Sequence, residues 1–403
     1  MNESYAVMLN EQQVGNLTRD AGDGAEFRLS EPYKHASPRP VLGQMFLDDP
    51  DRVHHNRIGV PPWFSNLLPE GRLRELIAER AGVHSSRELC LLALLGDDLP
   101  GAVRVVAEDV PDRATAADNQ GDHEADEPAD GWKFSLAGVQ LKFSARRNER
   151  GLTIPVSGVG GDWIVKLPDL RYPDVPRNEY ATMRWAQASG IEVPRAELIS
   201  VGDISGLPEL RLPESESSVY AVRRFDRTDD GGRVHMEDFA QVLGVYPRDK
   251  YRQCNYETLG NLIFALTGKD GLTQFIRRLV FVVASGNGDA HLKNWSLRYP
   301  DGVSASLAPA YDLVSTVVYN SDDGLALNLA KTKDWRQLDM AAFTRLAGRI
   351  GFSEAAMREI VQEALDAVLT AWDGIGRSGL YPMEMRNALA KHIRRLALPR
   401  ASR

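Results

Sequence analysis

The chain has 403 residues, 43% of them hydrophobic, and a formal net charge of −8. This length predicts two or three folded units rather than one small core, and the charge argues against a protein that coats nucleic acid. Two well-separated cysteines, Cys90 and Cys254, exclude a disulfide framework and a zinc site. Without a signal-like N-terminus or an apolar run of bilayer length, we expect a cytoplasmic protein that does not bind membranes.

The first 107 residues predict strands followed by helices. Two short apolar runs separated by a polar turn indicate a β-hairpin, and Gly82 and Gly96 are placed to end two helices. The expected order is three strands, two helices and a last strand, at residues 5–9, 13–18, 27–29, 70–81, 87–95 and 101–106. We interpret residues 1–107 as an N-terminal subdomain.

Residues 108–130 differ sharply from their surroundings. They contain nine acids against one arginine, and Val110 is their only large apolar residue. Such a segment buries too little apolar surface to offset the entropy lost on ordering. We interpret it as a flexible linker, with an acidic ligand-binding segment as the alternative.

Two further blocks follow the linker. Residues 131–226 are rich in strand patterns, and residues 227–403 are dominated by helical ones. Strands are expected at 133–136, 141–144, 153–156, 163–167, 198–201 and 219–225, and helices at 178–189, 256–267, 272–285, 340–350, 354–372 and 383–398. This order predicts an α+β, two-lobed, protein-kinase-like fold with a strand-rich N-terminal lobe and an all-α C-terminal lobe.

The strongest functional signal lies in residues 288–294. Asp289 and Asn294 are five residues apart, and Asp312 follows in an apolar setting. Kinases use such an Asp-x-x-x-x-Asn loop and a later Asp: the first Asp accepts the substrate proton, and the other two side chains hold Mg²⁺. An Asp in a Gly-rich turn is ordinarily a turn residue, but a buried carboxylate is costly unless it is paired or binds metal. The three residues together predict phosphoryl transfer.

Two basic residues lie within the same loop. His291 could bind metal or shuttle a proton, but we favour a structural role beneath the loop. Lys293 could neutralise the transferring phosphoryl group, or it could be solvated. The sequence does not decide between these two roles for Lys293.

Lys166 ends an apolar run, residues 163–166, that resembles the kinase strand whose lysine reaches the nucleotide phosphates. A strand lysine ordinarily faces solvent, but the apolar neighbours and the predicted sheet favour the functional role. Glu179, early in the next predicted helix, is a candidate ion-pair partner for Lys166. Its alternative is an ordinary first-turn acid that the helix dipole favours.

Two Gly-containing segments could approach phosphate groups. The backbone between Ser135 and Lys142 could do so because Ala137 and Gly138 permit close contact. Residues 158–161 are also Gly-rich and equally fit a hairpin turn. Neither segment would be convincing without Asp289, Asn294 and Asp312.

Residues 219–225 predict a strand that leads into a polar loop, where a kinase has the hinge between its lobes. Backbone groups of Arg223, Arg224 and Phe225 could bind the edge of adenine. The alternative is an edge strand whose arginine side chains extend to solvent.

Together these segments resemble the HipA family of bacterial serine/threonine kinases, the toxins of type II toxin–antitoxin pairs. The resemblance covers nearly the whole chain, in the order and rough spacing of the family. It is carried by residues 63–70, 101–103, 135–140, 163–166, 224–227, 237–241, 289–294 and 311–312.

The resemblance implies Asp289 as the catalytic base, Lys166 as the phosphate-binding lysine, and Asn294 and Asp312 as ligands of Mg²⁺ beside ATP. It also implies a nucleotide site with a mobile phosphate-binding loop and a hinge. The further residues of that site would be Ala137, Gly138, Val139, Gln140, Leu141, Lys142, Arg223, Arg224, Phe225, His291, Lys293 and Tyr311.

Ser135 matches the serine that family members phosphorylate on themselves. A phosphoserine there would add about −1.5 to −2 charges and repel nucleotide, so Ser135 is a candidate off-switch. Two departures from the family pattern concern the nucleotide contacts. Residues 140–142 are Gln-Leu-Lys where relatives often have Gln-Glu-Lys, and the hinge begins with Arg223 rather than an acid.

The resemblance implies an ATP-dependent toxin kinase that phosphorylates a translation component, typically an aminoacyl-tRNA synthetase. It also implies a HipB-like helix-turn-helix antitoxin as partner, through which operator DNA would be met. Arg394, Arg395 and Arg400 could touch DNA, but an ordinary polar helix face is favoured. The alternatives are a catalytically weak corepressor scaffold and a lipid or small-molecule kinase, which lacks support from any membrane-binding amphipathic stretch.

Overall fold

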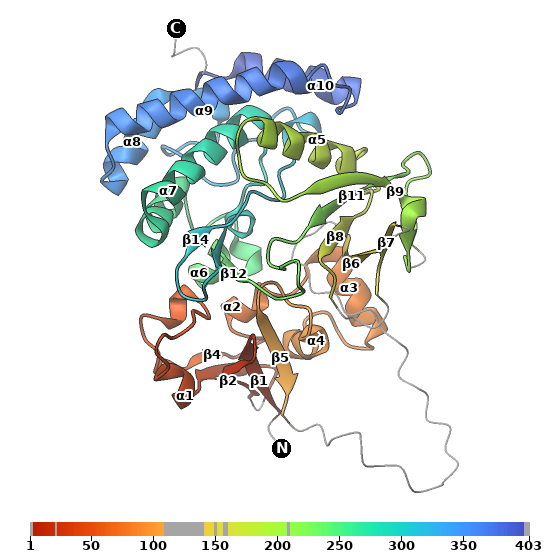
Figure 1. Cartoon of the computed structure of the whole chain (residues 1–403), viewed down its shortest axis with the longest axis vertical. Coiled ribbons are helices and arrows are strands. Elements are labelled where there is room, and N and C mark those ends of the chain that lie inside the picture. Colours follow the sequence, from red (N-terminus) through yellow and green to blue (C-terminus); the bar gives the residue numbers. More distant parts are fainter. Residues whose placement is uncertain are drawn as a thin grey trace, which may run out of the picture.

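The computed structural model describes residues 3–20, 22–108, 141–148, 151–155, 160–207 and 210–398. Several predictions lie outside these residues: the strand at 133–136, nearly all of the acidic segment, Ser135 and the loop residues Ala137, Gly138, Val139 and Gln140. Figure 1 shows the N-terminal strands at one end of the long axis, a second sheet in the middle and the C-terminal helices at the other end.

The N-terminal part is an antiparallel sheet of five strands in the order β4-β3-β2-β1-β5. Phe27 packs edge-on against Phe46 and Phe64, with ring centroids 5.3 and 4.8 Å apart, so one face of the sheet is sealed by aromatic side chains. The elements are β1 (Ser4–Leu9), β2 (Gln12–Arg19), β3 (Ala25–Leu29), α1 (Glu31–Lys34), β4 (His54–Asn56), α2 (Pro62–Ser65), α3 (Gly71–Arg80), α4 (Glu88–Leu95) and β5 (Val103–Ala107).

The middle sheet has six strands in the order β10-β7-β6-β8-β11-β9, and only β10 and β7 pair in parallel. Its strand β11 alternates between two cores: Val219 and Ala221 pack with the N-terminal part, and Tyr220 and Val222 with the helical part. The elements are β6 (Lys142–Asn148), β7 (Gly151–Thr153), β8 (Trp163–Lys166), α5 (Val175–Ala188), β9 (Ala196–Ser200), β10 (Ile204–Ser205) and β11 (Ser218–Arg223).

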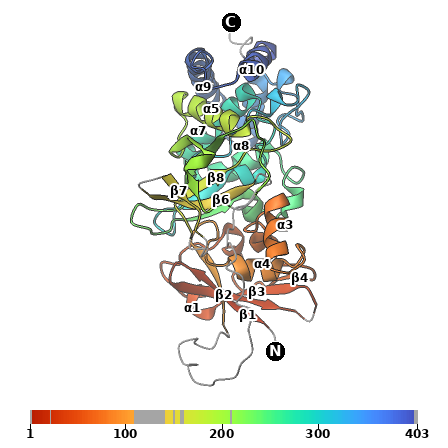
Figure 2. The ribbon, with the colours of Figure 1, turned by 90° about the vertical axis from the view of Figure 1, so that its right-hand side faces the viewer.

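The C-terminal part is mainly helical, as Figure 2 shows from the side. Two predicted helices form one element, α7, which is interrupted at Gly268 by a positive φ of 69°. The helices are α6 (Phe239–Val242), α7 (Tyr256–Ser285), α8 (Met340–Ile350), α9 (Glu354–Ile375) and α10 (Met383–Arg395). In the described part of the chain, no helix combines the length and the apolarity needed to cross a bilayer.

The prediction of an all-α C-terminal lobe is wrong in one respect. A three-stranded antiparallel sheet lies beside α6 and the catalytic loop, made of β12 (His235–Asp238), β13 (Ser296–Tyr299) and β14 (Ser306–Leu307). These strands have only two to four residues each, which is too short for a period-2 pattern to be seen in the sequence. The sheet matters because β12 and β13 flank the loop that carries the candidate site.

Candidate active site

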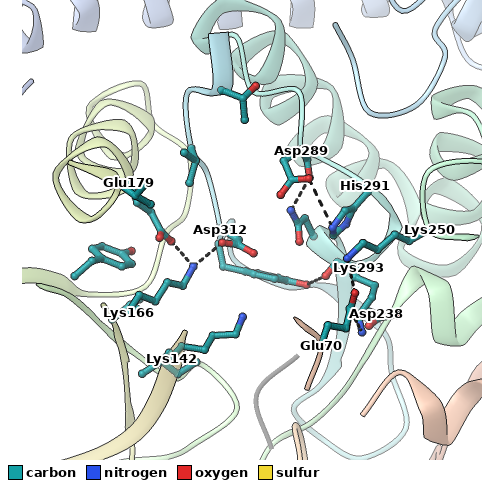
Figure 3. Close-up of a pocket in the computed structure, with 18 of the residues that line it drawn as sticks. Glu70, Lys142, Lys166, Glu179, Asp238, Lys250, Asp289, His291, Lys293 and Asp312 are labelled. Carbon is teal, nitrogen blue, oxygen red and sulfur yellow. Dashed lines mark hydrogen bonds and ion pairs between the residues drawn. The ribbon is translucent and has the colours of Figure 1, made fainter. Parts of the chain in front are cut away.

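One cavity of about 610 Å³ lies between the middle sheet and the helical part. Side chains from three regions converge on it: the segment before α3, the strands β6, β8 and β11, and the loop after α7 (Figure 3). Most of the predicted site residues that the structure describes line this cavity. These are Lys142, Lys166, Arg223, Arg224, Phe225, Asp289, His291, Lys293, Asn294, Tyr311 and Asp312.

Lys166 points into the cavity because of its place in the sheet register. On neighbouring strands it pairs with Lys142 and Tyr220, and residues directly opposite one another share a face. The Lys166 ammonium donates to Glu179 Oε1 at 2.6 Å and to Asp312 Oδ1 at 2.5 Å. The predicted Lys166–Glu179 ion pair is therefore confirmed, and Asp312 joins it.

Burial and charge together set the protonation of these three groups. Burial alone would lower the pKa of Lys166, but Asp312 and Glu179 raise it well above the usual range. Burial raises the pKa of Glu179 to about 7, against the opposing effect of Lys166. Asp312 has its pKa held well below its usual range, because Lys166 and Lys142 outweigh its burial. Lys166 and Asp312 are thus charged at neutral pH.

Asp312 also has an unusual backbone, with φ at +56°. A non-glycine residue in this left-handed region costs about 1–3 kcal/mol and persists where the surroundings impose it, often at functional sites. The strain is consistent with a carboxylate that the chain holds in a fixed direction.

The catalytic loop begins where α7 ends at Gly286, whose φ of +61° lets the chain turn sharply. Within the loop, Asn287 Oδ1 accepts from the Asp289 amide at 2.9 Å, and Asn294 Nδ2 donates to the Asp289 carbonyl at 2.7 Å. The predicted pair Asp289 and Asn294 is therefore in direct contact through side chain and backbone. The Asn294 amide oxygen is not used in that bond.

The Asp289 carboxylate lies in the cleft with 48% of its side chain exposed. Its Oδ1 accepts a hydrogen bond from the Tyr251 hydroxyl. Although half of the side chain is exposed, the surrounding walls of the cavity desolvate the carboxylate and raise the pKa of Asp289 to about 6, against the lowering effect of the Tyr251 hydrogen bond. A carboxylate with this pKa is ionised at neutral pH and can still accept a proton.

His291 lies beneath the loop and is 5% exposed. Its ring packs edge-on against Tyr251, with centroids 4.8 Å apart, and burial lowers its pKa to about 3. A neutral, packed imidazole fits the structural role that the sequence favoured. Its Nδ1 has no hydrogen-bond partner among the described residues.

Lys293 takes neither of the roles considered from the sequence. It is buried, and its ammonium lies 2.9 Å from Glu70 Oε1 and donates to the Asn66 carbonyl at 3.1 Å. Lys250 donates to Glu70 Oε2 at 2.7 Å. Sequence reasoning missed Glu70, Lys250 and Tyr251 as residues of the site. The only signal was that Glu70 ends the segment 63–70, one of those that carry the family resemblance.

Lys142 also projects into the cavity from β6 (Figure 3). Burial lowers its pKa to about 8, and among the described residues no acid is in ion-pair contact with it. A buried ammonium without such a partner would be stabilised by an anionic ligand. The preceding residue, Leu141, accepts a backbone hydrogen bond from Leu167 at 3.1 Å, but it is not among the described residues that line the cavity.

The segment Arg223 to Phe225 leaves β11 at the cavity, but two of its backbone amides already have partners in the protein. The amides of Arg223 and Arg224 donate to the carbonyls of Arg195 and Asp162, both at 2.8 Å. Any contact with adenine must use other backbone groups of the segment. The alternative reading is wrong, since β9 and not β11 is the edge strand and Arg224 does not extend to solvent.

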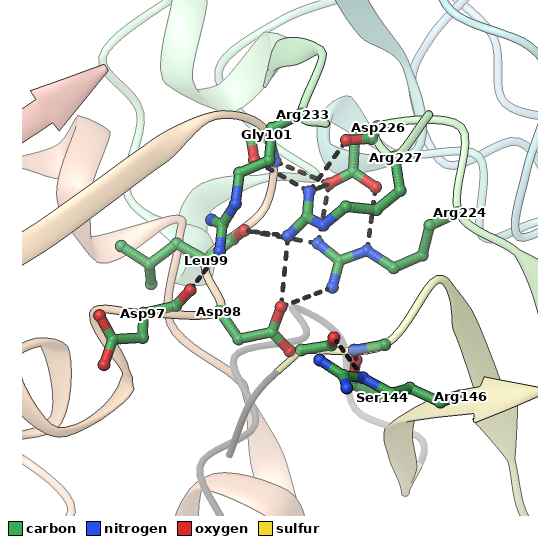
Figure 4. A network of polar contacts seen from close by, with 12 residues as sticks. Asp97, Asp98, Leu99, Gly101, Ser144, Arg146, Arg224, Asp226, Arg227 and Arg233 are labelled. Carbon is green, nitrogen blue, oxygen red and sulfur yellow. Dashed lines mark hydrogen bonds and ion pairs between the residues drawn. The ribbon is translucent and has the colours of Figure 1, made fainter. Parts of the chain in front are cut away.

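The side chain of Arg224 belongs to a buried hinge cluster with Asp98, Asp226 and Arg227 (Figure 4). Arg224 contacts Asp98 at 2.9 Å and Asp226 at 2.8 Å, and Arg227 contacts the same two acids at 3.2 and 2.9 Å. The cluster joins the segment after α4 to the end of β11. The Arg224 side chain therefore has a structural role. Three of the four residues in the motif at 224–227, namely Arg224, Asp226 and Arg227, belong to this cluster.

Two aromatic rings, those of Phe225 and Tyr311, line the cavity that Arg223 and Arg224 also line, and could contact a ligand there. The rings of Phe225 and Tyr311 are 5.4 Å apart and inclined by 37°, and both line the cavity. The Tyr311 hydroxyl donates to the Lys293 carbonyl at 2.8 Å, which fixes the ring. The pair offers an apolar surface of the size of a flat heterocycle.

Within the described residues, no group of three or more His, Cys, Asp or Glu side chains could hold a metal ion by itself. Mg²⁺ does not need one, because it commonly binds one or two carboxylates and completes its shell with phosphate oxygens and water. Asp312 and Asn294 supply a carboxylate and an amide oxygen on the same cavity. This donor set fits Mg²⁺ that arrives with a nucleotide.

Two domain families match the chain and together span most of its length. Residues 5–106 match the HipA N-terminal domain, and residues 134–372 match the HipA-like C-terminal domain. The chain belongs to the HipA family. A solved complex of Shewanella oneidensis HipA, HipB and operator DNA contains a chain with the same fold, at a TM-score of 0.72 and 18% identity over 97% of this chain and 96% of that one. The predicted family and kinase-like α+β fold are confirmed.

Curated relatives of this HipA-family chain carry kinase names. It is 44% identical to "Putative kinase Y4dM" of Sinorhizobium fredii, over 91% of this chain and 90% of that protein. It is 27% identical to "Serine/threonine-protein kinase toxin HipA" of Shewanella oneidensis, over 63% of this chain and 62% of that protein. Homology thus places this chain among the HipA-like kinases.

Proposed function

We propose that this chain is an ATP-dependent protein serine/threonine kinase that acts as the toxin of a type II toxin–antitoxin pair. One observation carries the kinase proposal: Lys166, paired with Glu179 and Asp312, faces the same cavity as Asp289 and Asn294. A lysine–glutamate pair, two oxygen donors for Mg²⁺ and a carboxylate base are the parts that kinases use for phosphoryl transfer.

The proposed nucleotide site has three sections. Lys166 and Lys142 would bind the phosphates, together with Leu141 and the loop residues 137–140 that precede it. Phe225 and Tyr311 would hold adenine, with hinge groups of Arg223 and Arg224 that the sheet does not use. His291 and Lys293 would support the loop from below.

Mg²⁺ would be held by Asn294 and Asp312 and would neutralise charge on the nucleotide phosphates. Asp289 would accept the proton of the acceptor hydroxyl as its oxygen bonds to the γ-phosphorus. The bond from that phosphorus to the bridging oxygen then breaks, and ADP leaves with the bond's electron pair. A pKa of about 6 suits Asp289 to this role near neutral pH.

Four functional segments are proposed along the chain: an N-terminal subdomain at 1–107, an acidic linker at 108–130, a kinase N-lobe at 131–226 and a C-lobe at 227–403. The proposed partner is a HipB-like helix-turn-helix antitoxin through which the protein meets operator DNA. Support comes from the fold shared with a HipA chain solved with HipB and operator DNA. The proposed substrate is a translation component, specifically an aminoacyl-tRNA synthetase.

The kinase proposal is tested with [γ-³²P]ATP and Mg²⁺ in extracts that contain the synthetases, with Asp289→Asn as the inactive control. We expect label on one synthetase and on Ser135 with the wild-type protein, and on neither with the variant. Label on lipid would instead support a lipid kinase. No label at all, with a folded protein, would support a corepressor scaffold and refute the kinase proposal.

The toxin proposal and the Ser135 switch need separate experiments. Induced expression should arrest growth with the wild-type chain and not with Asp289→Asn, and co-expression of a HipB-like helix-turn-helix antitoxin should relieve the arrest. Absence of arrest despite kinase activity would refute only the toxin role. For the switch, Ser135→Asp should bind ATP more weakly than Ser135→Ala because of its charge; equal binding would refute it.

A further inference from the structure

Glu70 enters the active-site cavity from the N-terminal part of the chain. It lies immediately before α3, and its side chain is only 16% exposed. Its two carboxylate oxygens contact two different lysines: Oε1 lies 2.9 Å from Lys293, and Oε2 lies 2.7 Å from Lys250. We name Glu70, Lys250 and Lys293 the catalytic-loop cluster; Figure 3 shows it beside Asp289 and His291.

The segment that carries Glu70 is itself firmly held against the C-terminal part. Trp63 Nε1 donates to Glu237 at 3.1 Å, and Gln241 donates to the Trp63 carbonyl at 3.2 Å. Asn66 Nδ2 donates to the Val245 carbonyl at 2.7 Å. Trp63 and Asn66 are buried. The carboxylate is therefore presented from a fixed backbone and not from a loose loop.

Both lysines adjoin residues of the proposed chemistry. Lys293 directly precedes Asn294, the proposed magnesium ligand, and Lys250 directly precedes Tyr251, whose hydroxyl donates to Asp289. Lys250 and Lys293 are 5% and 6% exposed. Two buried ammonium groups in such a place need a counter-charge. Although burial opposes it, Lys293 and Lys250 hold the pKa of Glu70 at about 2, so the carboxylate is charged.

We propose that Glu70 is a positioning residue, by which the N-terminal part of the chain holds Lys250 and Lys293 away from Asp289 and the nucleotide. The proposal rests on the kinase function proposed above. Without the carboxylate, Lys250 would pair with Asp289, and Lys293 would pair with Asp238 or with the nucleotide phosphates. An ion-paired Asp289 accepts a proton poorly, so turnover would fall while nucleotide binding persists.

Glu70→Gln tests this role, because it keeps the shape and removes the charge. The matched control is Glu79→Gln, an exposed glutamate on α3. Phosphate transfer from [γ-³²P]ATP to myelin basic protein and to the chain itself gives kcat and the KM for ATP. Binding of a fluorescent ADP analogue with Mg²⁺ gives the nucleotide affinity.

We expect Glu70→Gln to lower kcat by about tenfold to a hundredfold, the scale of a small misplacement at a catalytic group. KM for ATP should stay within about threefold or fall, since freed lysines attract phosphate. Glu79→Gln should match the wild-type protein. A kcat unchanged by Glu70→Gln, or a loss of nucleotide affinity equal to the loss in turnover, overturns the proposal.

Glu70→Gln could also act by unfolding the segment, so two further variants are included. Glu70→Asp keeps the charge and should recover part of kcat. In a Lys293→Met background, Glu70→Gln should lower kcat less than it does alone, because residues that act through one another are not additive. Additive losses in the two variants contradict the proposal. If the wild-type protein transfers no phosphate, the kinase function fails, which is a different result from equal activity in all variants.

Discussion

Two buried ionic clusters, which differ in their basic residues and in their balance of charge, join the N-terminal part of this chain to the rest. The hinge cluster uses two arginines against two aspartates, and its side chains are at most 7% exposed. The catalytic-loop cluster uses two lysines against one glutamate and borders an open cavity. Arginine forks fix geometry with several hydrogen bonds, whereas a lysine is a compact charge that can change partner.

This difference suggests that one cluster serves stability and the other serves turnover. The hinge cluster, in which each arginine contacts both aspartates, should matter for stability. A lysine cluster with an excess positive charge beside Asp289 should matter for turnover. The four changes below test that division, beginning with the largest expected effect.

Asp289→Asn should cause the largest loss of catalytic activity. The amide cannot accept a proton, so transfer of phosphate should fall by about a thousandfold, within the usual range for loss of a general base. The melting temperature should be nearly unchanged, because the carboxylate is half exposed. Phosphate transfer measured with labelled ATP checks this. Activity above a tenth of the wild-type value would remove Asp289 from the role of base.

Asp98→Ala should break the hinge cluster and leave Arg224 and Arg227 short of one acid. The free energy of unfolding should fall by about 3–5 kcal/mol, as when one partner of a buried pair is removed. Turnover per folded molecule should change little. Urea denaturation and kinetics check both halves of the prediction.

The control for Asp98→Ala is Asp97→Ala, which alters an exposed neighbour and should change stability by at most about 0.5 kcal/mol. If Asp98→Ala instead lowered turnover strongly and left stability intact, the contrast between the two clusters would be wrong.

Lys166→Met should reduce kcat/KM for ATP by about a hundredfold, the usual effect of losing one preorganised charged donor. It removes the cation from between Glu179 and Asp312, so both carboxylates lose their partner. Lys269→Met, at an exposed position of α7, is the control. If Lys166→Met lowered stability and left kcat/KM for ATP unchanged, Lys166 would have a structural role and no role in phosphoryl transfer.

The smallest effect concerns pH. Asp289, with its pKa raised to about 6 by burial, is active as the carboxylate, so turnover should fall as the pH drops through about 6. Tyr251→Phe removes a hydrogen bond to the charged form and should move this limb upward by about one pH unit, the equivalent of about 1.4 kcal/mol. Profiles of kcat/KM against pH would show it; an unmoved limb would assign the titration to another group.

The sequence predicted the elements of the fold well where their patterns are long. The helical patterns of α8 and α9, the placement of Gly82 and Gly96 after α3 and α4, and the hairpin of β1 and β2 all gave correct elements. It failed for β12, β13 and β14, whose few residues carry no visible period.

The sequence also predicted residues that the structure brings to one cavity. The spacing of Asp289 and Asn294, Asp312 in its apolar setting and Lys166 on its strand are properties of short segments, because a loop or strand fixes which near neighbours share a face. Only the tertiary structure decided which distant charges meet. Arg224 pairs with Asp98, and Lys293 pairs with Glu70. A buried charge is stable only when the folded chain brings an opposite charge into contact with it, and these partners are far apart in the sequence.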